Sequence, residues 1–220
     1  MRAKDAIHSP TPALTTTSTV EEALGMLMEH RVRHLPVVDE DDALVGIISE
    51  DQLMEASGPD DEIGPLLAAR PIFVAPDAHI FDAARTMVDH ELSTVPVADA
   101  RGAYMGLLRR HDIFDKFAQM LATQEAGAIV ALEVSPRDYA LAKLVHVIEQ
   151  NNAKVRAVAS ESPERSTDQI RVTLKLNVKD TSRIRHVLEH HGYHVVASFG
   201  EEDDEELGDL VDEFMRYLEV

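Results

Sequence analysis

The fold is decided by a short stretch, His34-Leu35-Pro36-Val37-Val38-Asp39, which returns 60 residues later as Thr94-Val95-Pro96-Val97-Ala98-Asp99. The same offset aligns Gly46-Ile47-Ile48 with Gly106-Leu107-Leu108, and no gap is needed anywhere. Agreement at one fixed offset, at Pro, Gly and Asp as well as at apolar positions, indicates an internal duplication. The sequence therefore predicts two copies of one structural unit.

Each copy predicts the same order of elements. The apolar residues of 20–30 fall at i, i+3, i+4, i+7 and i+8, which is typical of an amphipathic helix, and Thr19 is placed as its N-cap. Residues 35–38 and 44–48 predict two buried strands, and a further helix follows them. Because a unit of about 60 residues buries too little surface to be stable alone, we expect the two copies to pack face to face. That packing creates a pseudo-twofold axis and a cleft.

The doubled pattern of a helix, h-P-V-V-D, a polar turn and G-h-h resembles the CBS domain, which occurs in tandem pairs called Bateman modules. The resemblance predicts repeat 1 over residues 1–60 and repeat 2 over residues 61–122. It implies a regulatory rather than a catalytic module. It also implies a cleft that binds AMP, ADP, ATP or a related adenosyl ligand.

In this family, a Ser or Thr followed three residues later by Asp opens the last helix of a repeat and holds the ribose. Repeat 2 keeps the acid as Asp112 but has Arg109 in place of the hydroxyl residue, whereas repeat 1 keeps Ser49 and has Gln52 in place of the acid. A carboxylate accepts hydrogen bonds from both ribose hydroxyls. Asp112 is therefore the candidate ribose contact, with Arg109 beside it.

The resemblance also implies that basic residues just before the first strand of one repeat reach the ligand held by the other repeat. Arg33 and His34 occupy that place in repeat 1, so we expect them to converge with Arg109 on the phosphates. The adenine is expected against Ile72 and Phe73, through backbone groups. The alternative is that these side chains are solvated charges at helix ends, flanking an unused cleft.

The composition limits the partners. The 21 Lys+Arg and 40 Asp+Glu give a net charge of -19, which disfavours nucleic-acid and membrane surfaces as partners. The absence of Cys excludes disulfides and thiolate metal sites. No apolar run is long enough for a membrane span and no secretory signal is visible, so a cytoplasmic location is expected.

The acidic charge also leads to an expectation about the salt concentration in which the protein works. Abundant acid with only six Lys is typical of halophilic proteins, because at about 1 M salt the Debye length is only about 3 Å and self-repulsion is screened. An ordinary acidic protein is the alternative. Against this background, Arg31, Arg33, His34, Arg109 and Arg110 are a basic exception.

A second domain is predicted over residues 125–200, with strand–helix–strand–strand–helix–strand order, which is the ferredoxin-like arrangement. The fold class is therefore α+β. Following a CBS pair, this domain resembles an ACT domain, and the combination resembles small regulatory proteins of acetoin utilisation. ACT domains that bind amino acids usually have Gly in the first strand–helix turn, but residues 135–139 contain none. A dimerisation role is therefore favoured over amino-acid binding.

Residues 201–220 predict an acidic linker and a C-terminal amphipathic helix. Six consecutive acids at 201–206 precede an apolar stripe formed by Leu207, Leu210, Val211, Phe214 and Leu218. Such a stripe must be buried, either on its own domain or on a partner subunit.

The sequence thus predicts a regulatory sensor, expected as a homodimer, in which a nucleotide shifts the population of two repeat arrangements and acts on a regulated enzyme or transporter. One alternative is a dimerisation scaffold with an empty cleft, and another is an amino-acid sensor acting through the ACT-like domain. No catalytic triad, phosphate-binding Gly-rich loop or metal-ligand motif is present, so no catalytic or metal-binding residue is predicted.

Overall fold

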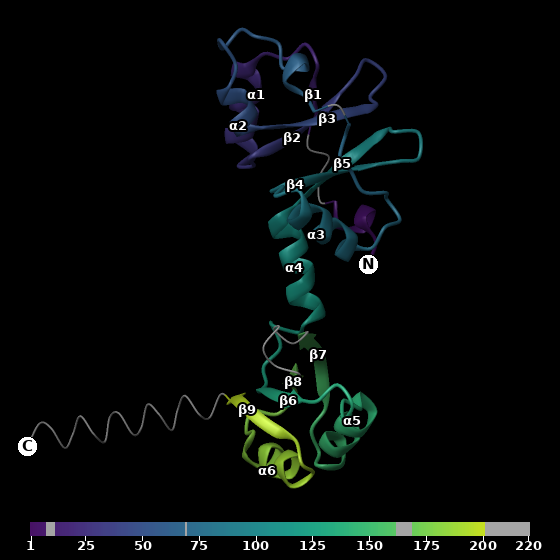
Figure 1. The fold of residues 1–220 in the computed structure, drawn as a ribbon, viewed down its shortest axis with the longest axis vertical. Coiled ribbons are helices and arrows are strands. Elements are labelled where there is room, and N and C mark those ends of the chain that lie inside the picture. Colours follow the sequence, from purple (N-terminus) through teal and green to yellow (C-terminus); the bar gives the residue numbers. More distant parts are fainter. Residues whose placement is uncertain (8–11, 69, 162–168, 201–220) are drawn as a thin grey trace, which may run out of the picture. The chain divides into compact units, whose positions relative to one another are not determined.

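The computed structural model describes residues 1–220 except 8–11, 69, 162–168 and 201–220 (Figure 1). The chain divides into two compact units, Met1–Lys116 and Phe117–Val220, and the boundary falls within helix α4 (Arg110–Met120). The predicted C-terminal linker and helix, 201–220, lie outside the described residues.

The first unit contains the predicted duplication. Each copy has a helix, an antiparallel hairpin and a second helix, and nearly every boundary recurs at the same offset of 60. The elements are η1 (Ala3–Ala6), β1 (Leu14–Thr15), α1 (Val20–His30), β2 (His34–Val38), β3 (Leu44–Ser49), α2 (Glu50–Met54), η2 (Gly64–Leu66), α3 (Ile80–Asp89), β4 (Thr94–Ala98), β5 (Tyr104–Arg109) and α4. Both hairpins also carry a register shift at the matching position, 37/38 and 97/98.

The start and end of α1 follow from local chemistry. The Thr19 hydroxyl accepts a hydrogen bond from the Glu22 amide at 3.2 Å, and the Glu22 carboxylate accepts one from the Thr19 amide at 3.0 Å. This capping box fixes the first turn. The helix ends at Arg31, whose φ of 52° is left-handed, and its counterpart Glu91 has a φ of 53°. The two repeats therefore leave their first helix in the same way.

Reciprocal hydrogen bonds join the repeats about a pseudo-twofold axis. The Leu44 amide donates to the Gly102 carbonyl at 2.8 Å, and the Tyr104 amide donates to the Asp42 carbonyl at 3.1 Å. Positions 42 and 102 correspond to each other, as do 44 and 104, so each bond is the symmetry mate of the other. The predicted pairing of the repeats is confirmed.

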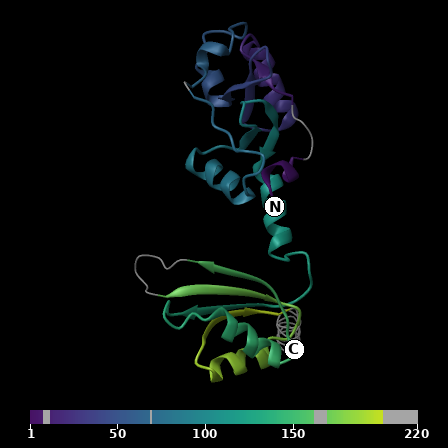
Figure 2. The ribbon, with the colours of Figure 1, turned by 90° about the vertical axis from the view of Figure 1, so that its right-hand side faces the viewer.

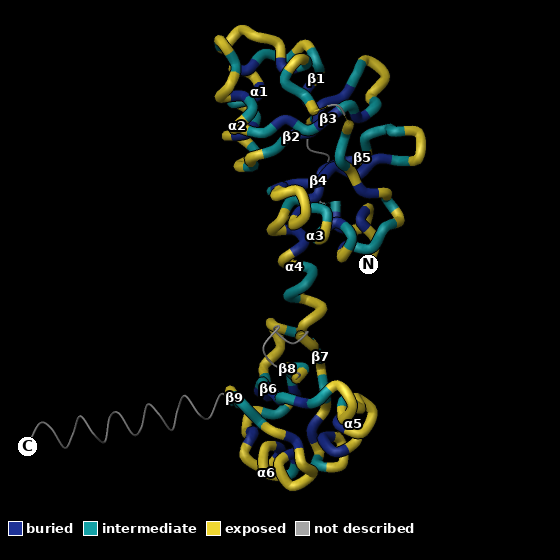
Figure 3. Tube along the Cα trace, in the orientation of Figure 1, coloured by how far each residue is buried: buried dark blue, intermediate teal, exposed yellow. Residues whose placement is uncertain are grey.

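The core of this unit is formed by buried residues of the strands and of the helices that pack against them (Figure 3). Leu35, Ile48, Leu53, Ile80 and Leu108 are each at most 2% exposed. Burial of one such side chain contributes about 1.5–3 kcal/mol. The apolar strand residues of the repeat pattern therefore form the core of the unit. By fixing the strands, they also position the polar residues at the strand ends.

The second unit has the predicted ferredoxin-like topology. Its elements are β6 (Ile129–Val134), α5 (Leu141–Gln150), β7 (Val155–Glu161), β8 (Ile170–Leu176), α6 (Ser182–His190) and β9 (His194–Phe199). The four strands pair antiparallel in the order β7-β8-β6-β9. Helices α5 and α6 lie on one side of this sheet, as Figure 2 shows. They cover a core that includes Val130, Leu132, Leu144, Leu174 and Leu188.

Helix α5 begins only at Leu141, after a turn that starts at Ser135. The amides of Asp138 and Tyr139 both donate to the Ser135 carbonyl at 3.0 Å, and the Ser135 hydroxyl bonds the Asp138 carboxylate at 2.7 Å. The turn before the helix is therefore closed by its own groups, which delays the helix start.

Candidate functional site

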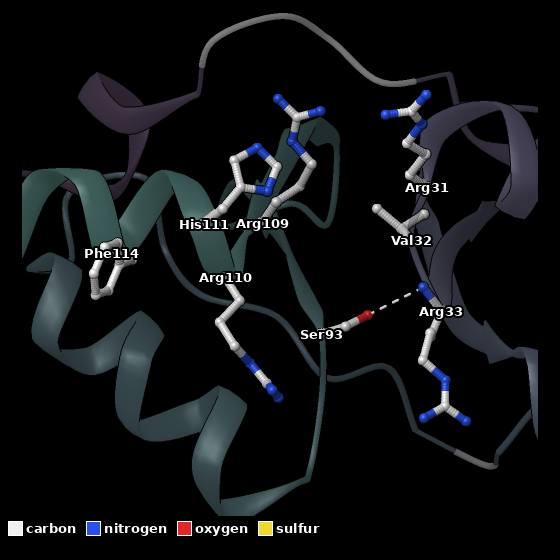
Figure 4. A pocket seen from close by; sticks show the side chains of 8 residues that line it. All are labelled: Arg31, Val32, Arg33, Ser93, Arg109, Arg110, His111 and Phe114. Atoms are coloured by element: carbon white, nitrogen blue, oxygen red, sulfur yellow. Dashed lines mark hydrogen bonds between the residues drawn. The ribbon is translucent and has the colours of Figure 1, made fainter.

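A cationic pocket lies in the first unit, where both repeats contribute to its lining (Figure 4). Its volume is about 420 Å³. The lining residues are Arg31, Val32, Arg33, Ser93, Arg109, Arg110, His111 and Phe114. Four arginines thus surround one cavity in a chain whose net charge is -19. Clustered cations in a concave site attract a specific anion.

The strand and helix ends place these cations. Arg31 is the left-handed residue that ends α1, and Arg33 immediately precedes β2. Arg109 ends β5, and Arg110 begins α4. In Figure 4, the side chains of Arg31 and Arg109 extend to one side of the pocket, whereas those of Arg33 and Arg110 extend to the other.

The arginines differ in their partners. Arg33 pairs with Glu50 and Asp51, each at 3.4 Å, and Arg110 donates to the Leu92 carbonyl at 2.8 Å. Among the described residues, Arg31 has no ion-pair or hydrogen-bond partner for its guanidinium. Arg31 is therefore the arginine most available to a ligand, although the sequence reasoning placed Arg33 in that role.

Asp112 lies beside the pocket, 3% exposed, but is not among the lining residues. Its carboxylate accepts from the Arg109 Nε at 3.0 Å and from the Arg109 amide at 3.2 Å, and it lies 3.2 Å from the His111 Nε2. A buried carboxylate without a partner is costly, so these contacts satisfy it. Asp112 thus bonds Arg109 in the structure, and ribose binding by Asp112 stays a prediction.

The counterpart of Asp112 in repeat 1 shows what this position does structurally. Gln52 accepts from the Ser49 amide at 2.9 Å, and its side-chain amide donates to the Leu66 carbonyl at 2.9 Å. The side chains of Gln52 and Asp112 therefore both accept a hydrogen bond from the backbone amide three residues earlier, at the start of a helix. A capping role accounts for part of the residue pattern that the sequence assigns to ribose binding.

His34 lies at the contact between the repeats. Its Nδ1 is 2.9 Å from the Ser93 hydroxyl and accepts from the Ser93 amide at 3.2 Å, and its carbonyl accepts from the Thr94 hydroxyl at 2.9 Å. Burial lowers the pKa of His34, and the neighbouring Arg33 lowers it further. The imidazole is therefore kept neutral, as a hydrogen-bond acceptor that joins the repeats. His34 is not among the residues that line the pocket.

Ser93 is the site residue that the sequence reasoning missed. Its hydroxyl also accepts from the Arg33 amide at 3.2 Å, a contact drawn in Figure 4. Position 93 is the counterpart of position 33 at the offset of 60. Only the alignment of the two repeats could have indicated Ser93, because residues at matching positions meet near the pseudo-twofold axis.

The predicted adenine contacts do not line the cationic pocket. Phe73 is 43% exposed and lines a separate cavity of about 360 Å³, which Asp99 and Gly102 also line. The next residue, Val74, bridges to Val97 near the turn end of the hairpin, whereas Arg109 pairs with Thr94 at the opposite end. The strand pairing therefore separates these positions. Ile72 lines neither cavity, and the adenine contacts remain a prediction.

Among the described residues, no three His, Asp or Glu side chains gather as metal ligands. None of the helices in this part of the chain combines the length and apolar character that a membrane crossing requires.

Among the known proteins that resemble this chain, three are described. CBS domain-containing protein CBSX1 of Arabidopsis thaliana, a chloroplastic protein, is 26% identical over 160 residues, or 58% of this chain and 66% of the relative. The chain thus spans just under two thirds of that protein. A CBS domain pair/ACT domain protein of Thermotoga maritima matches with a TM-score of 0.51 at 20% identity, over 55% of this chain and 99% of the other. An acetoin utilization protein (AcuB) of Vibrio cholerae matches with a TM-score of 0.50 at 24% identity, over 56% and 95%.

The two structural likenesses concern the fold, which both share with this chain. The family model of the CBS domain matches twice, over residues 3–58 and 63–119, and these ranges together cover slightly more than half of the chain. The duplicated pattern, the paired hairpins and the reciprocal hydrogen bonds agree with that match. The chain belongs to the CBS domain family, as a protein with a tandem CBS pair.

Proposed function

We propose that this protein is a regulatory sensor whose CBS pair binds one anionic adenine nucleotide in the cationic pocket. The observation that carries the proposal is the gathering of Arg31, Arg33, Arg109 and Arg110 around one cavity of a strongly acidic chain. An overall negative charge repels anions in general, so only a ligand that contacts several of these cations at once gains binding energy.

Binding begins at Arg31 and proceeds by an exchange of partners at Arg109. The phosphates contact the Arg31 guanidinium, which has no partner among the described residues, and draw Arg109 away from Asp112. The Asp112 carboxylate, now without its guanidinium partner, accepts hydrogen bonds from the ribose hydroxyls. Without the Arg109 guanidinium, the 3% exposed Asp112 carboxylate keeps only the Arg109 amide and the His111 ring as partners among the described residues, so the loss of the guanidinium favours the arrival of the ribose.

The signal is a change in the relation of the two repeats. Arg31 belongs to repeat 1 and Arg109 to repeat 2, while the pairs Leu44–Gly102 and Asp42–Tyr104 hold the repeats together. A ligand that binds one repeat arrangement more tightly shifts the population towards it. The shift acts on a partner, which we expect to be a regulated enzyme or transporter, and the protein acts as a homodimer.

Titration calorimetry with AMP, ADP and ATP, in low salt and again in molar salt, tests this proposal. We expect heat in low salt, one nucleotide per chain, and weaker binding as salt rises because phosphate contacts are screened. The absence of heat and of any thermal shift under both conditions would refute nucleotide binding. The matched pair Asp112→Asn and Gln52→Glu alters equivalent helix starts, and only Asp112→Asn is expected to reduce affinity.

The second candidate is a dimerisation scaffold with an unused cleft. The shared capping role of Asp112 and Gln52 favours it, because that role accounts for an acid at position 112 without any ligand. An Asp112→Ala variant with an unchanged nucleotide response favours the scaffold.

A further inference from the structure

The sheet of the second unit has one face that α5 and α6 leave open. The helix-covered face presents Val130, Leu132, Val172 and Leu174, all fully buried. Side chains alternate between faces along a strand, so the intervening residues belong to the other face. They include Ile129 and Ala131 of β6, Ala157 and Ala159 of β7, Thr173 and Lys175 of β8, and Ala197 and Phe199 of β9.

This open face contains a groove with a volume of about 230 Å³. Its floor is formed by small or apolar side chains of three strands, among them Ile129, Ala157, Ala159 and Thr173, and Leu121 borders it. Lys175 adds a positive charge. Small residues on the floor leave room for larger side chains from another segment.

The apolar part of the open face lies where the last strand ends. Phe199, the final residue of β9, pairs in register with Ile129, and its side chain is 64% exposed. The opposite end of the face carries charge instead, with Arg171 paired to Glu133 at 3.1 Å. The chain therefore leaves the sheet beside the groove.

The next residues have the length and pattern to cover this groove. Seven residues from Gly200 to Glu206 span at most about 25 Å when extended, whereas the sheet from β9 to β7 is about 14 Å wide, at three strand spacings. The apolar stripe of 207–218 then repeats at helical spacing, and 12 helical residues are about 18 Å long. A helix this short is marginal alone in water, so it requires a surface to pack against.

We propose that the C-terminal segment 207–218 docks as an amphipathic helix in this groove, on the open sheet face of its own chain. Its stripe of Leu207, Leu210, Val211, Phe214 and Leu218 covers the small residues of the floor. The acids at 201–206 repel one another at low ionic strength, and salt screens that repulsion, so docking tightens as salt rises. Nucleotide binding is proposed for the first unit and docking of the segment for the second, so the two proposals are independent of each other.

Disulfide crosslinking in the full-length chain tests the proposal, because the sequence contains no Cys of its own. Ala159→Cys is combined with Leu210→Cys or Phe214→Cys on the stripe. The control combines Ala159→Cys with Asp209→Cys, which lies on the opposite side of the predicted helix at nearly the same tether length. Since the tether gives all pairs a similar effective concentration, a difference in rate reports docking.

We expect the stripe pairs to crosslink within one chain, on the order of tenfold faster than the control, and faster still in molar salt. Equal rates for the stripe and control pairs would overturn the proposal. A product at the mass of two chains would overturn it as well, because it places the segment on a second copy.

A measurement without new Cys residues accompanies this test, in case the sheet substitutions impair folding. Phe214→Asp in the full chain is expected to expose the groove and raise the fluorescence of an apolar dye such as anilinonaphthalene sulfonate. The control, Asp209→Asn, leaves it unchanged. An equal dye response in both variants contradicts docking.

Discussion

Replacement of Arg31 by Ala is the perturbation that separates a working nucleotide site from a cluster of surface charges. Among the described residues the Arg31 guanidinium has no partner, so the substitution breaks no contact within that part of the chain. A hydrogen bond between charged groups contributes about 1.5–3 kcal/mol, and the lower value applies because Arg31 is exposed. At about 1.4 kcal/mol per factor of ten, nucleotide affinity is expected to fall roughly tenfold.

The matched control is Glu91→Ala. Arg31 is the C-cap of α1 and Glu91 follows the C-cap of α3, and their φ values are 52° and 53°, so the backbone cost of alanine is similar in the two variants. Calorimetry with ATP is expected to show weaker binding for Arg31→Ala and unchanged or slightly tighter binding for Glu91→Ala. Changes of equal size and opposite sign in the two variants would refute the reasoning, since net charge rather than the pocket would then determine binding.

Three further predictions concern stability. Ser93→Ala removes the hydroxyl that accepts from the Arg33 amide and contacts His34, so urea denaturation is expected to show a loss of about 1–2 kcal/mol. The pKa of His34 is lowered from 6.5, so as pH falls the unfolded chain takes up this proton before the folded chain does. The stability that is present above pH 6.5 is therefore lost as pH falls towards the lowered pKa. His34→Gln is expected to flatten this dependence of the urea midpoint on pH between pH 7 and 5. Gly127→Ala places a Cβ against the Leu176 carbonyl at a φ of +143°, so the thermal transition of the second unit is expected to fall by several degrees, whereas an unchanged midpoint contradicts this account.

The repeat pattern predicted the first unit well, because the pattern and the fold depend on the same residues. Pro36 and Pro96, Gly46 and Gly106, and the apolar residues around them are the residues that pair in the two hairpins. In β8 (Ile170–Leu176), one face is likewise buried and the other is not, in agreement with the strand order predicted for the second domain.

The site was predictable only in part, because repeat alignment brings positions together but does not choose their partners. Arg109 and Arg33 both line one pocket, and their contact with phosphates stays a prediction. The pairing of Arg33 with Glu50 and Asp51 depends on where α2 starts, and the pairing of Arg109 with Asp112 depends on side-chain conformation. Neither follows from the spacing of residues along the chain.

The most direct test of the central claim is a crystal structure of the full chain with ATP bound. We predict phosphate oxygens within hydrogen-bond distance of Arg31 and Arg109, the ribose against Asp112, and a lengthened Arg109–Asp112 contact. A nucleotide bound at the equivalent position of the other repeat, against Glu50 and Glu91, would contradict the account. An empty cationic pocket at a saturating concentration of ATP would contradict it as well.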